Sequence, residues 1–155
     1  MGLYNFDGII ISHLGNISGR NVARENTLSY VKEALAAGFH VCIDVVFANE
    51  SFLLPGPDDT FAPIPPAFLS NQKIWCRACT PTTLNALCDL NVHTIPFATD
   101  SVVLTSAQFL WSLPPAVLTP RSIATFPEFA DANWCADADF DFAGVCTNHP
   151  EDWRC

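Results

Sequence analysis

The sequence predicts an α/β fold in one domain, with strands and helices that alternate around a parallel sheet. Its 155 residues suffice for one well-buried core and fall within the size of a single domain. Residues 8–11 form a short apolar run typical of a buried strand, whereas residues 26–38 change to helical spacing and end at Gly38. Residues 40–47 repeat the buried-strand pattern. A strand, a helix and a second strand within about 40 residues are typical of a right-handed βαβ unit.

The same alternation recurs in the middle of the chain. A loop rich in Pro, Asp and Gly is predicted over residues 55–66, followed by a single helical turn at 66–71. A strand at 73–76 and a helix at 81–90 come next, with Thr80 as the expected N-cap. Further short apolar stretches predict strands at residues 92–97, 102–104, 109–113, 122–126 and 142–146. Repeated βα units favour a reduced barrel over an open doubly wound sheet.

Composition limits the classes of partner. Half of the residues are hydrophobic and 15% are charged, against roughly 25% charged in an average soluble protein. This leaves little polar surface, so we interpret the chain as a subunit of a larger protein assembly, with a tightly packed monomer as the alternative. A net charge of −9 argues against binding to nucleic acid or to an anionic membrane. No apolar run reaches the ~18–20 residues of a transmembrane segment.

The cysteines predict a reducing, intracellular compartment, either the cytoplasm or an organelle interior. There are seven of them, an odd number at irregular spacing, unlike the disulfide framework of a small secreted protein. The first seven residues contain no basic region leading into an apolar stretch, so no secretory signal is seen in the chain as given.

The sequence contains two groups of potential metal ligands, and for both a structural role is favoured over metal binding. Cys76 and Cys79 form a Cys-x-x-Cys, which suits half a zinc site or a redox pair. On a strand they point to opposite faces, so buried thiols acting as small hydrophobes are favoured. The acidic stretch 131–141 lacks the glycine and distal glutamate of an EF-hand and is predicted to be a solvated loop.

Three short segments resemble, in order and spacing, the opening of the glycerophosphodiester phosphodiesterase-like (PLC-like phosphodiesterase) family. Residues 11–16 (Ile-Ser-His-Leu-Gly-Asn) correspond to the His-Arg-Gly of that family, residues 25–27 to its Glu-Asn-Thr, and residues 43–45 to its Glu-Ile-Asp-Val. Looser landmarks continue the resemblance to about residue 153. It implies a reduced or incomplete TIM-type (β/α) barrel over residues 1–155, whose strand C-termini carry a divalent metal, two catalytic histidines and a phosphate-binding arginine.

Carried over position by position, the resemblance implies a degenerate site. His13 matches the first catalytic histidine, but Leu14 stands where the family has its arginine and offers an anion nothing. Of the metal-binding Glu-x-Asp pair, Asp44 remains while Cys42 replaces a hard oxygen ligand by sulfur. Pro57 occupies the position of the second histidine and has no proton to donate.

The next strand of the family carries a ligand and a lysine two residues apart, and Arg77 and Cys79 match these positions. We therefore expect the Arg77 guanidinium to lie beside Asp44 and to take over the space and charge of the missing cation.

The leading hypothesis is a catalytically inactive phosphodiesterase-like barrel, a pseudoenzyme without cofactor that serves as a structural subunit. The alternative in the enzyme class is a divergent phosphodiesterase that uses His13, with Mg²⁺ or Ca²⁺ weakly bound at Glu25 and Asp44. A third hypothesis is a binding module for a phosphorylated small molecule. Glu25 has a simpler interpretation as well, since a carboxylate is favoured in the first turn of the helix that follows it.

Overall fold

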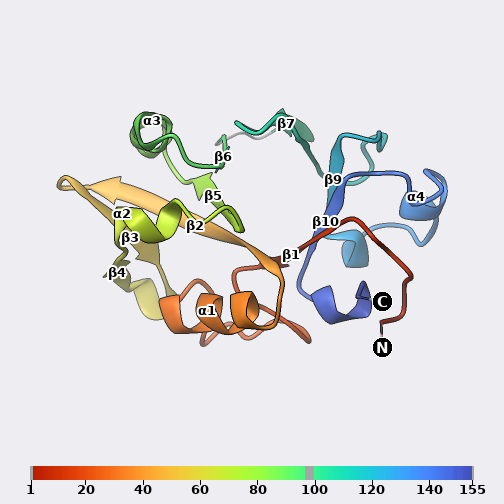
Figure 1. Cartoon of the computed structure of the whole chain (residues 1–155), viewed down its shortest axis with the longest axis horizontal. Coiled ribbons are helices and arrows are strands. Elements are labelled where there is room, and N and C mark those ends of the chain that lie inside the picture. Colours follow the sequence, from red (N-terminus) through yellow and green to blue (C-terminus); the bar gives the residue numbers. More distant parts are fainter. Residues whose placement is uncertain (1, 97–99, 155) are drawn as a thin grey trace.

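A ten-stranded sheet runs through the part of the chain that this computed structural model describes, residues 2–96 and 100–154. Four α-helices accompany it, so the mixed α/β domain expected from the sequence is confirmed (Figure 1). The strands are β1 (Ile9–His13), β2 (His40–Ala48), β3 (Ser51–Pro55), β4 (Phe61–Pro63), β5 (Ile74–Ala78), β6 (Thr94–Ile95), β7 (Val102–Leu104), β8 (Leu110–Ser112), β9 (Ser122–Thr125) and β10 (Gly144–Thr147). The α-helices are α1 (Leu28–Ala36), α2 (Pro66–Leu69), α3 (Pro81–Leu90) and α4 (Asn133–Ala136), and three 3₁₀ turns are η1 (Pro57–Asp59), η2 (Pro127–Phe129) and η3 (Pro150–Asp152).

Seven of the strands pair in parallel, in the order β6-β5-β2-β1-β10-β9-β8. The first and last parts of the chain thus meet at the centre of the sheet, where β1 lies between β2 and β10 (Figure 1). In this register His13 stands opposite Cys42, and Asp44 stands opposite Arg77. β7 runs antiparallel to β8 and extends that side of the sheet.

The prediction of an irregular loop over residues 55–66 is wrong in part. β2 turns back into an antiparallel hairpin with β3, which pairs in turn with β4. Asn49 and Glu50 form the connection with φ angles of 51° and 62°. Positive φ at both central residues is the geometry of a type I′ turn, which matches the twist of the two strands. Within the predicted loop, residues 56–60, which include η1, and residues 64–65 lie outside the strands and α-helices.

The start of α3 and the end of α1 lie at the predicted signals, whereas α1 begins at Leu28, two residues after the predicted start. Thr80 caps α3, because its side chain accepts a hydrogen bond from the backbone N–H of Thr83. α1 ends before Gly38, whose φ of +96° is a conformation that glycine adopts without strain. The acidic stretch 131–141 was predicted to be a loop, but the structure places the single-turn helix α4 within it. The predicted strand 92–97 is shorter, and residue 97 lies outside the described residues.

Side chains on the two faces of the parallel strands form separate cores. On one face, α1 and α3 cover β2 and β5 through residues such as Val31, Ile43 and Leu87. On the other face, each of the seven parallel strands contributes one buried residue to a common cluster, which we call the seven-strand cluster: Ile11, Cys42, Trp75, Ile95, Trp111, Ile123 and Cys146. A third core joins the N-terminal segment to α4 and the end of the chain.

Two hydrogen bonds connect β6 to the residues that follow β7. The backbone N–H of Ser106 donates to the carbonyl of Thr94, and the backbone N–H of Thr94 donates to the Ser106 hydroxyl. These bonds link β6, at one end of the strand order, to the connection between β7 and β8 at the other end. Within the described residues, each helix is too short or too polar to span a bilayer.

Candidate functional site

Polar side chains gather where four neighbouring parallel strands end. They are His13 at the end of β1, Asp44 in β2, Arg77 in β5 and Asn148 directly after β10. Each lies two positions beyond a member of the seven-strand cluster, and therefore on the same face of its strand: His13 after Ile11, Asp44 after Cys42, Arg77 after Trp75 and Asn148 after Cys146. The carboxyl ends of parallel strands are the usual place for a site in α/β proteins.

Asp44 and Arg77 form a bidentate ion pair, which confirms the prediction that Arg77 points toward Asp44. Nε of Arg77 lies 2.6 Å from Oδ1 and Nη2 lies 3.0 Å from Oδ2. The side chains are 22% and 35% exposed, so the pair is half-buried. Asn26 fixes β2 at this point, because the Asn26 side-chain amide forms hydrogen bonds with both the backbone N–H and the carbonyl of Asp44.

Glu25 pairs with a second arginine that the sequence reasoning missed. Nε of Arg20 donates to Oε1 at 2.9 Å and Nη2 to Oε2 at 3.3 Å. The interpretation of Glu25 as a helix cap is wrong, since α1 begins at Leu28 with Thr27 as N-cap and has no acidic residue in its first turn. The Glu25 side chain is 8% exposed, so Arg20 shields it from the outside.

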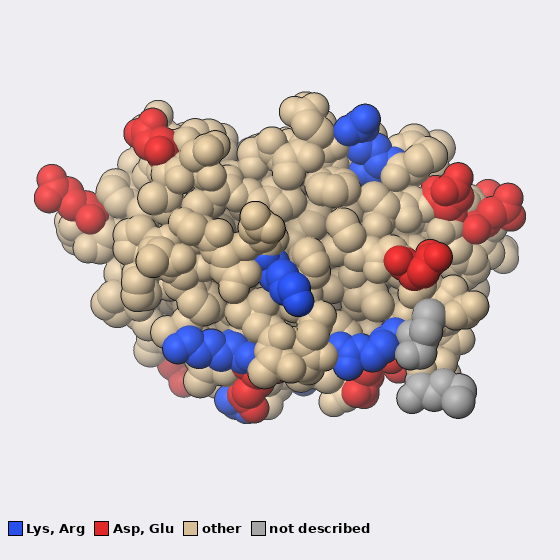
Figure 2. Space-filling model, viewed as in Figure 1, with Lys and Arg blue, Asp and Glu red and all other residues tan. Residues whose placement is uncertain are grey.

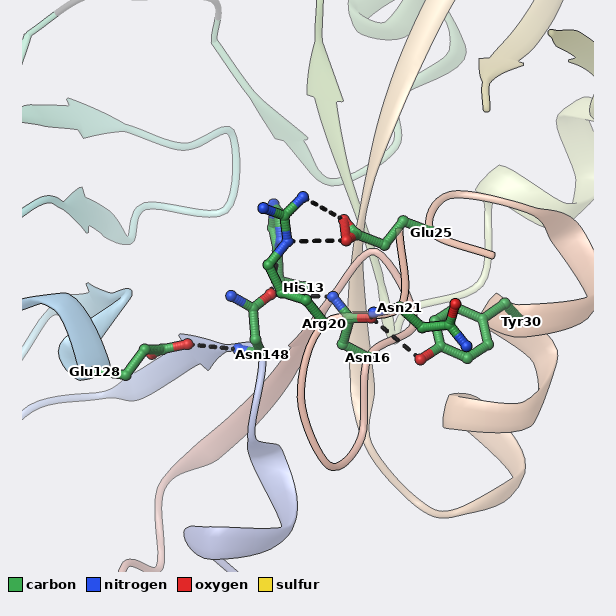
Figure 3. Close-up of polar contacts among 8 residues, drawn as sticks. All are labelled: His13, Asn16, Arg20, Asn21, Glu25, Tyr30, Glu128 and Asn148. Carbon is green, nitrogen blue, oxygen red and sulfur yellow. Dashed lines mark hydrogen bonds and ion pairs between the residues drawn. The ribbon is translucent and has the colours of Figure 1, made fainter. Parts of the chain in front are cut away.

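His13 is held by a chain of asparagines, which we call the asparagine network (His13, Asn16, Asn21, Tyr30 and Asn148; Figure 3). Nδ1 of His13 lies 3.2 Å from Oδ1 of Asn148, which also accepts a hydrogen bond from Nδ2 of Asn16 at 3.0 Å. Oδ1 of Asn16 accepts from the backbone N–H of Asn21 and from the hydroxyl of Tyr30. The other ring nitrogen of His13, Nε2, is buried and has no hydrogen-bond partner among the described residues.

Burial lowers the pKa of His13 below its ordinary value of 6.5, and the positive charge of Arg77 lowers it further. The carboxylates of Asp44 and Glu25 and the bond to Asn148 act in the opposite direction without reversing the shift. Arg77, Asp44 and Glu25 all act electrostatically on the His13 ring. The structure thus brings together His13, Glu25, Asp44 and Arg77.

Glu128 supports this arrangement from η2. Its carboxylate accepts a hydrogen bond from the hydroxyl of Thr147 at 2.9 Å. It also accepts one from the backbone N–H of Asn148 at 2.9 Å (Figure 3). Gly15 is needed at the other side of His13, because a Cβ at this position, where φ is +97°, would lie 2.6 Å from the ring of Tyr30. These contacts fix the loop that carries Asn16.

The donor set does not fit a divalent metal ion. Each of the two carboxylates implied as ligands, Glu25 and Asp44, is already bound on both oxygens by a guanidinium. Cys42 is fully buried in the seven-strand cluster, where its thiol contacts that of Cys146. Within residues 2–96 and 100–154, no group of three or more His, Cys, Asp or Glu side chains is arranged to hold a metal.

The remaining positions singled out from the sequence lie at the margins of the site. Leu14 is buried, with a φ of 58°, and its backbone pairs with Cys42 and Asn26. Pro57 is the first residue of η1. Just before η1, the carbonyl of Pro55 accepts a hydrogen bond from the side-chain amide of Asn26.

The prediction that Cys76 and Cys79 point to opposite faces of one strand applies only in part, because β5 ends at Ala78 and Cys79 lies just beyond it. Cys76 packs in the core beneath the helices, whereas Cys79 faces the strand ends. Burial raises the pKa of the Cys76 thiol to about 12, with a further contribution from Cys42, so the thiol stays protonated. The described cysteines are all free thiols, and Cys155 lies outside the described residues.

A cavity of about 330 Å³ opens beside the Asp44–Arg77 pair, and we call it the strand-end cavity. Its walls are mostly apolar and include Ile95, Val103, Trp111 and Phe126. The Phe126 ring also packs edge-on against the His13 ring, with 4.7 Å between the centroids. Asp44, Arg77 and Phe126 line this cavity, whereas His13 is not among the described residues that line it.

Sequence reasoning missed Arg20, Asn16, Asn148 and Glu128. Asn148 had one usable signal, because it lies two residues beyond the predicted strand 142–146 and so near the edge where β1 ends. Arg20 and Asn16 lie in a loop and Glu128 lies in η2, and the positions of both segments depend on tertiary packing.

No family model, no curated protein and no solved structure matches this chain.

Proposed function

We propose that this chain is a catalytically inactive barrel of the glycerophosphodiester phosphodiesterase type, which serves as a structural subunit of a larger protein assembly. The observation that carries this proposal is that Glu25 and Asp44, the two carboxylates at the vestigial metal-site positions, each pair with an arginine. Two guanidinium groups, on Arg20 and Arg77, supply the two positive charges that a divalent ion would bring. They satisfy the carboxylates without providing a Lewis acid or a site for an activated water.

The strand order supports the barrel part of the proposal. Seven parallel strands that all contribute to one cluster have to curve around it, because a flat sheet separates its outer strands by several strand widths of about 4.8 Å. The hydrogen bonds between Thr94 and Ser106 join the two ends of that order. A barrel with incomplete helical cover is consistent with both features.

The chemistry left at His13 supports the inactive part. Its lowered pKa makes a neutral ring at pH 7, which is suited to accept a proton. Phosphodiester cleavage also needs a group that stabilises the negative charge of the transition state. Leu14 cannot do this, and the guanidinium of Arg77 is engaged by Asp44.

The surface supports the structural role. β7 and β8 carry no α-helix of their own among the described elements, and Val102, Leu104 and Leu113 are 40%, 50% and 37% exposed there. Uncharged residues cover most of the face shown in Figure 2, with acidic groups toward its ends and Lys or Arg side chains near its centre and along its lower edge. A partner protein that covers this side would bury apolar residues that are otherwise in contact with water.

The test measures hydrolysis of a glycerophosphodiester, with Mg²⁺ or Ca²⁺ added, by the wild type, by His13→Ala and by an active member of the family as positive control. We expect the wild type and His13→Ala to be equally inactive. Turnover by the wild type that disappears in His13→Ala would refute the proposal and establish the enzyme alternative. Size-exclusion chromatography with light scattering on the same samples tests the structural role, for which a chain that is fully soluble and monomeric alone would count against a stable subunit interface.

A further inference from the structure

A second cavity, of about 140 Å³, lies where the N-terminal segment meets the end of the chain, and we call it the aromatic pocket. The backbone N–H of Tyr4 donates to the carbonyl of Asp152 at 2.8 Å and fastens these two segments together (Figure 1). The other walls come from η2, from α4 and from the residues after β10. Three aromatic residues and three carboxylates contribute to the lining: Tyr4, Phe140, Trp153, Glu128, Asp131 and Asp152.

The three rings of the pocket lie close together. The ring centroids of Tyr4 and Trp153 are 4.4 Å apart, and the Phe140 centroid lies 6.3 Å from each of them. Trp153 is buried, whereas Tyr4 and Phe140 are 42% and 40% exposed. The faces of aromatic rings carry partial negative charge and attract a cation within about 6 Å, most strongly at tryptophan. The rings therefore favour a positively charged occupant.

The charge of the lining has the same sign as the ring faces. No lysine or arginine among the described residues lines the pocket or forms an ion pair with one of its three carboxylates. A protonated His149, which also lines the pocket, would still leave two negative charges uncompensated. Arg154 is near in sequence, but its guanidinium donates to the carbonyl of Ala37. Charge complementarity therefore also requires a cation, in contrast to the strand ends, where each carboxylate already has an arginine.

The kind of cation follows from the available acceptors. Within the described residues, no three potential ligands are arranged to hold a metal ion. A primary ammonium group needs acceptors for three N–H donors. Both oxygens of Glu128 already accept hydrogen bonds from Thr147 and Asn148. One oxygen of Asp131 accepts from the backbone N–H of Asn133. A quaternary ammonium group has no N–H donor to satisfy, and ring faces with negative charge around them suit it.

We propose that the aromatic pocket binds a quaternary ammonium group, whose methyl groups contact the rings of Tyr4, Phe140 and Trp153 while the surrounding carboxylates balance its charge. The volume of about 140 Å³ is close to the ~150 Å³ of a protein cavity that holds benzene, so a group of the size of tetramethylammonium fits. This inference goes beyond the proposed function and does not depend on it, because the pocket shares no lining residue with the strand-end cavity and includes none of the vestigial metal-site positions.

The test compares tetramethylammonium with tert-butanol, which is also compact and tetrahedral but uncharged, and with methylammonium, a primary amine. Each probe is titrated into the full chain at constant ionic strength, and the indole N–H signals are followed in ¹H–¹⁵N spectra. We expect tetramethylammonium to shift the signal of Trp153 and to bind about tenfold more tightly than tert-butanol, as a partly desolvated cation–π contact implies. Methylammonium should bind more weakly than tetramethylammonium.

Two variants each remove one part of the site. Phe140→Leu keeps an apolar side chain without the ring face, and Asp152→Asn removes one charge. Each should weaken tetramethylammonium binding about three- to fivefold and leave tert-butanol binding unchanged. Phe61→Leu and Asp59→Asn are the matched controls, because both residues are exposed and lie in β4 and η1, outside the pocket. They should bind tetramethylammonium as the wild type does.

Several results would overturn the proposal: no binding of tetramethylammonium, equal affinities for tetramethylammonium and tert-butanol, tighter binding of methylammonium, or equal losses in the pocket variants and their controls. A shift confined to the indole signals of other tryptophans would do the same. The comparison of the three probes uses the wild type alone, so it does not depend on the variants folding.

Discussion

Replacement of Arg77 by alanine should destabilise the fold more than the loss of any surface ion pair in this chain. The change removes both charged hydrogen bonds to Asp44 and leaves that carboxylate without a counter-charge. Asp44 is held in place from below by Asn26, so it cannot move freely into water. The uncompensated charge therefore stays at the strand ends, beside the half-buried cavity.

The magnitude follows from the burial of the pair. Exposed ion pairs contribute about 0–1 kcal/mol to stability, and breaking a fully buried pair costs about 3–5 kcal/mol. With exposed fractions of 22% for Asp44 and 35% for Arg77, the pair lies between these limits. We expect Arg77→Ala to lower the free energy of unfolding by about 2–3 kcal/mol, because water reaches part of the carboxylate.

Urea unfolding followed by tryptophan fluorescence measures this loss. Arg24→Ala is the matched control, since Arg24 pairs with Glu33 on the surface, where the side chains are 42% and 52% exposed. The double variant Arg77→Ala, Asp44→Ala should recover part of the stability, because it removes the stranded charge. Equal losses for Arg77→Ala and Arg24→Ala, or a double-mutant cycle without coupling between Arg77 and Asp44, would refute the reasoning.

Three further predictions concern other parts of the fold. Arg20→Ala should lower the urea midpoint by less than Arg77→Ala, because the Arg20 side chain is mostly exposed although its partner Glu25 is buried. A midpoint lowered more by Arg20→Ala than by Arg77→Ala would contradict this. Thr80→Ala should cost about 1 kcal/mol of unfolding free energy through loss of the α3 cap, and an unchanged urea midpoint would contradict this. Burial, with a smaller contribution from the charge of His40, lowers the pKa of His93 to about 4. Because the unfolded chain then binds the proton more readily, the stability contribution of neutral His93 is full above pH 6.5 and is lost as the pH falls from 6.5 toward 4. We expect about 1–2 kcal/mol of loss after allowance for solvent screening, and a smaller loss in His93→Phe; equal pH profiles for the two proteins would exclude this origin.

Local features of the sequence determined most of the elements. The β-branched runs, the helical spacing and the Thr80 cap act over a few residues, so the strands β1, β2 and β5 and the helix α3 could be predicted without knowledge of the fold. The Asp44–Arg77 pair could also be predicted, because both side chains occupy neighbouring parallel strands that the family resemblance aligns. In the observed register Asp44 lies opposite Arg77.

Tertiary structure alone decided the surroundings of His13. Its partner Asn148 lies 135 residues away in the sequence, and the two meet because the first and last strands pair in parallel. Arg20 reaches Glu25 from within a loop whose path depends on the packing of Gly15 against Tyr30. A local pattern carries no information about such contacts, because the free energy that fixes them comes from burial and hydrogen bonding between segments that are distant along the chain. For the same reason the sequence identified a histidine of interest, and only the folded chain showed that its Nδ1 lies beside Asn148.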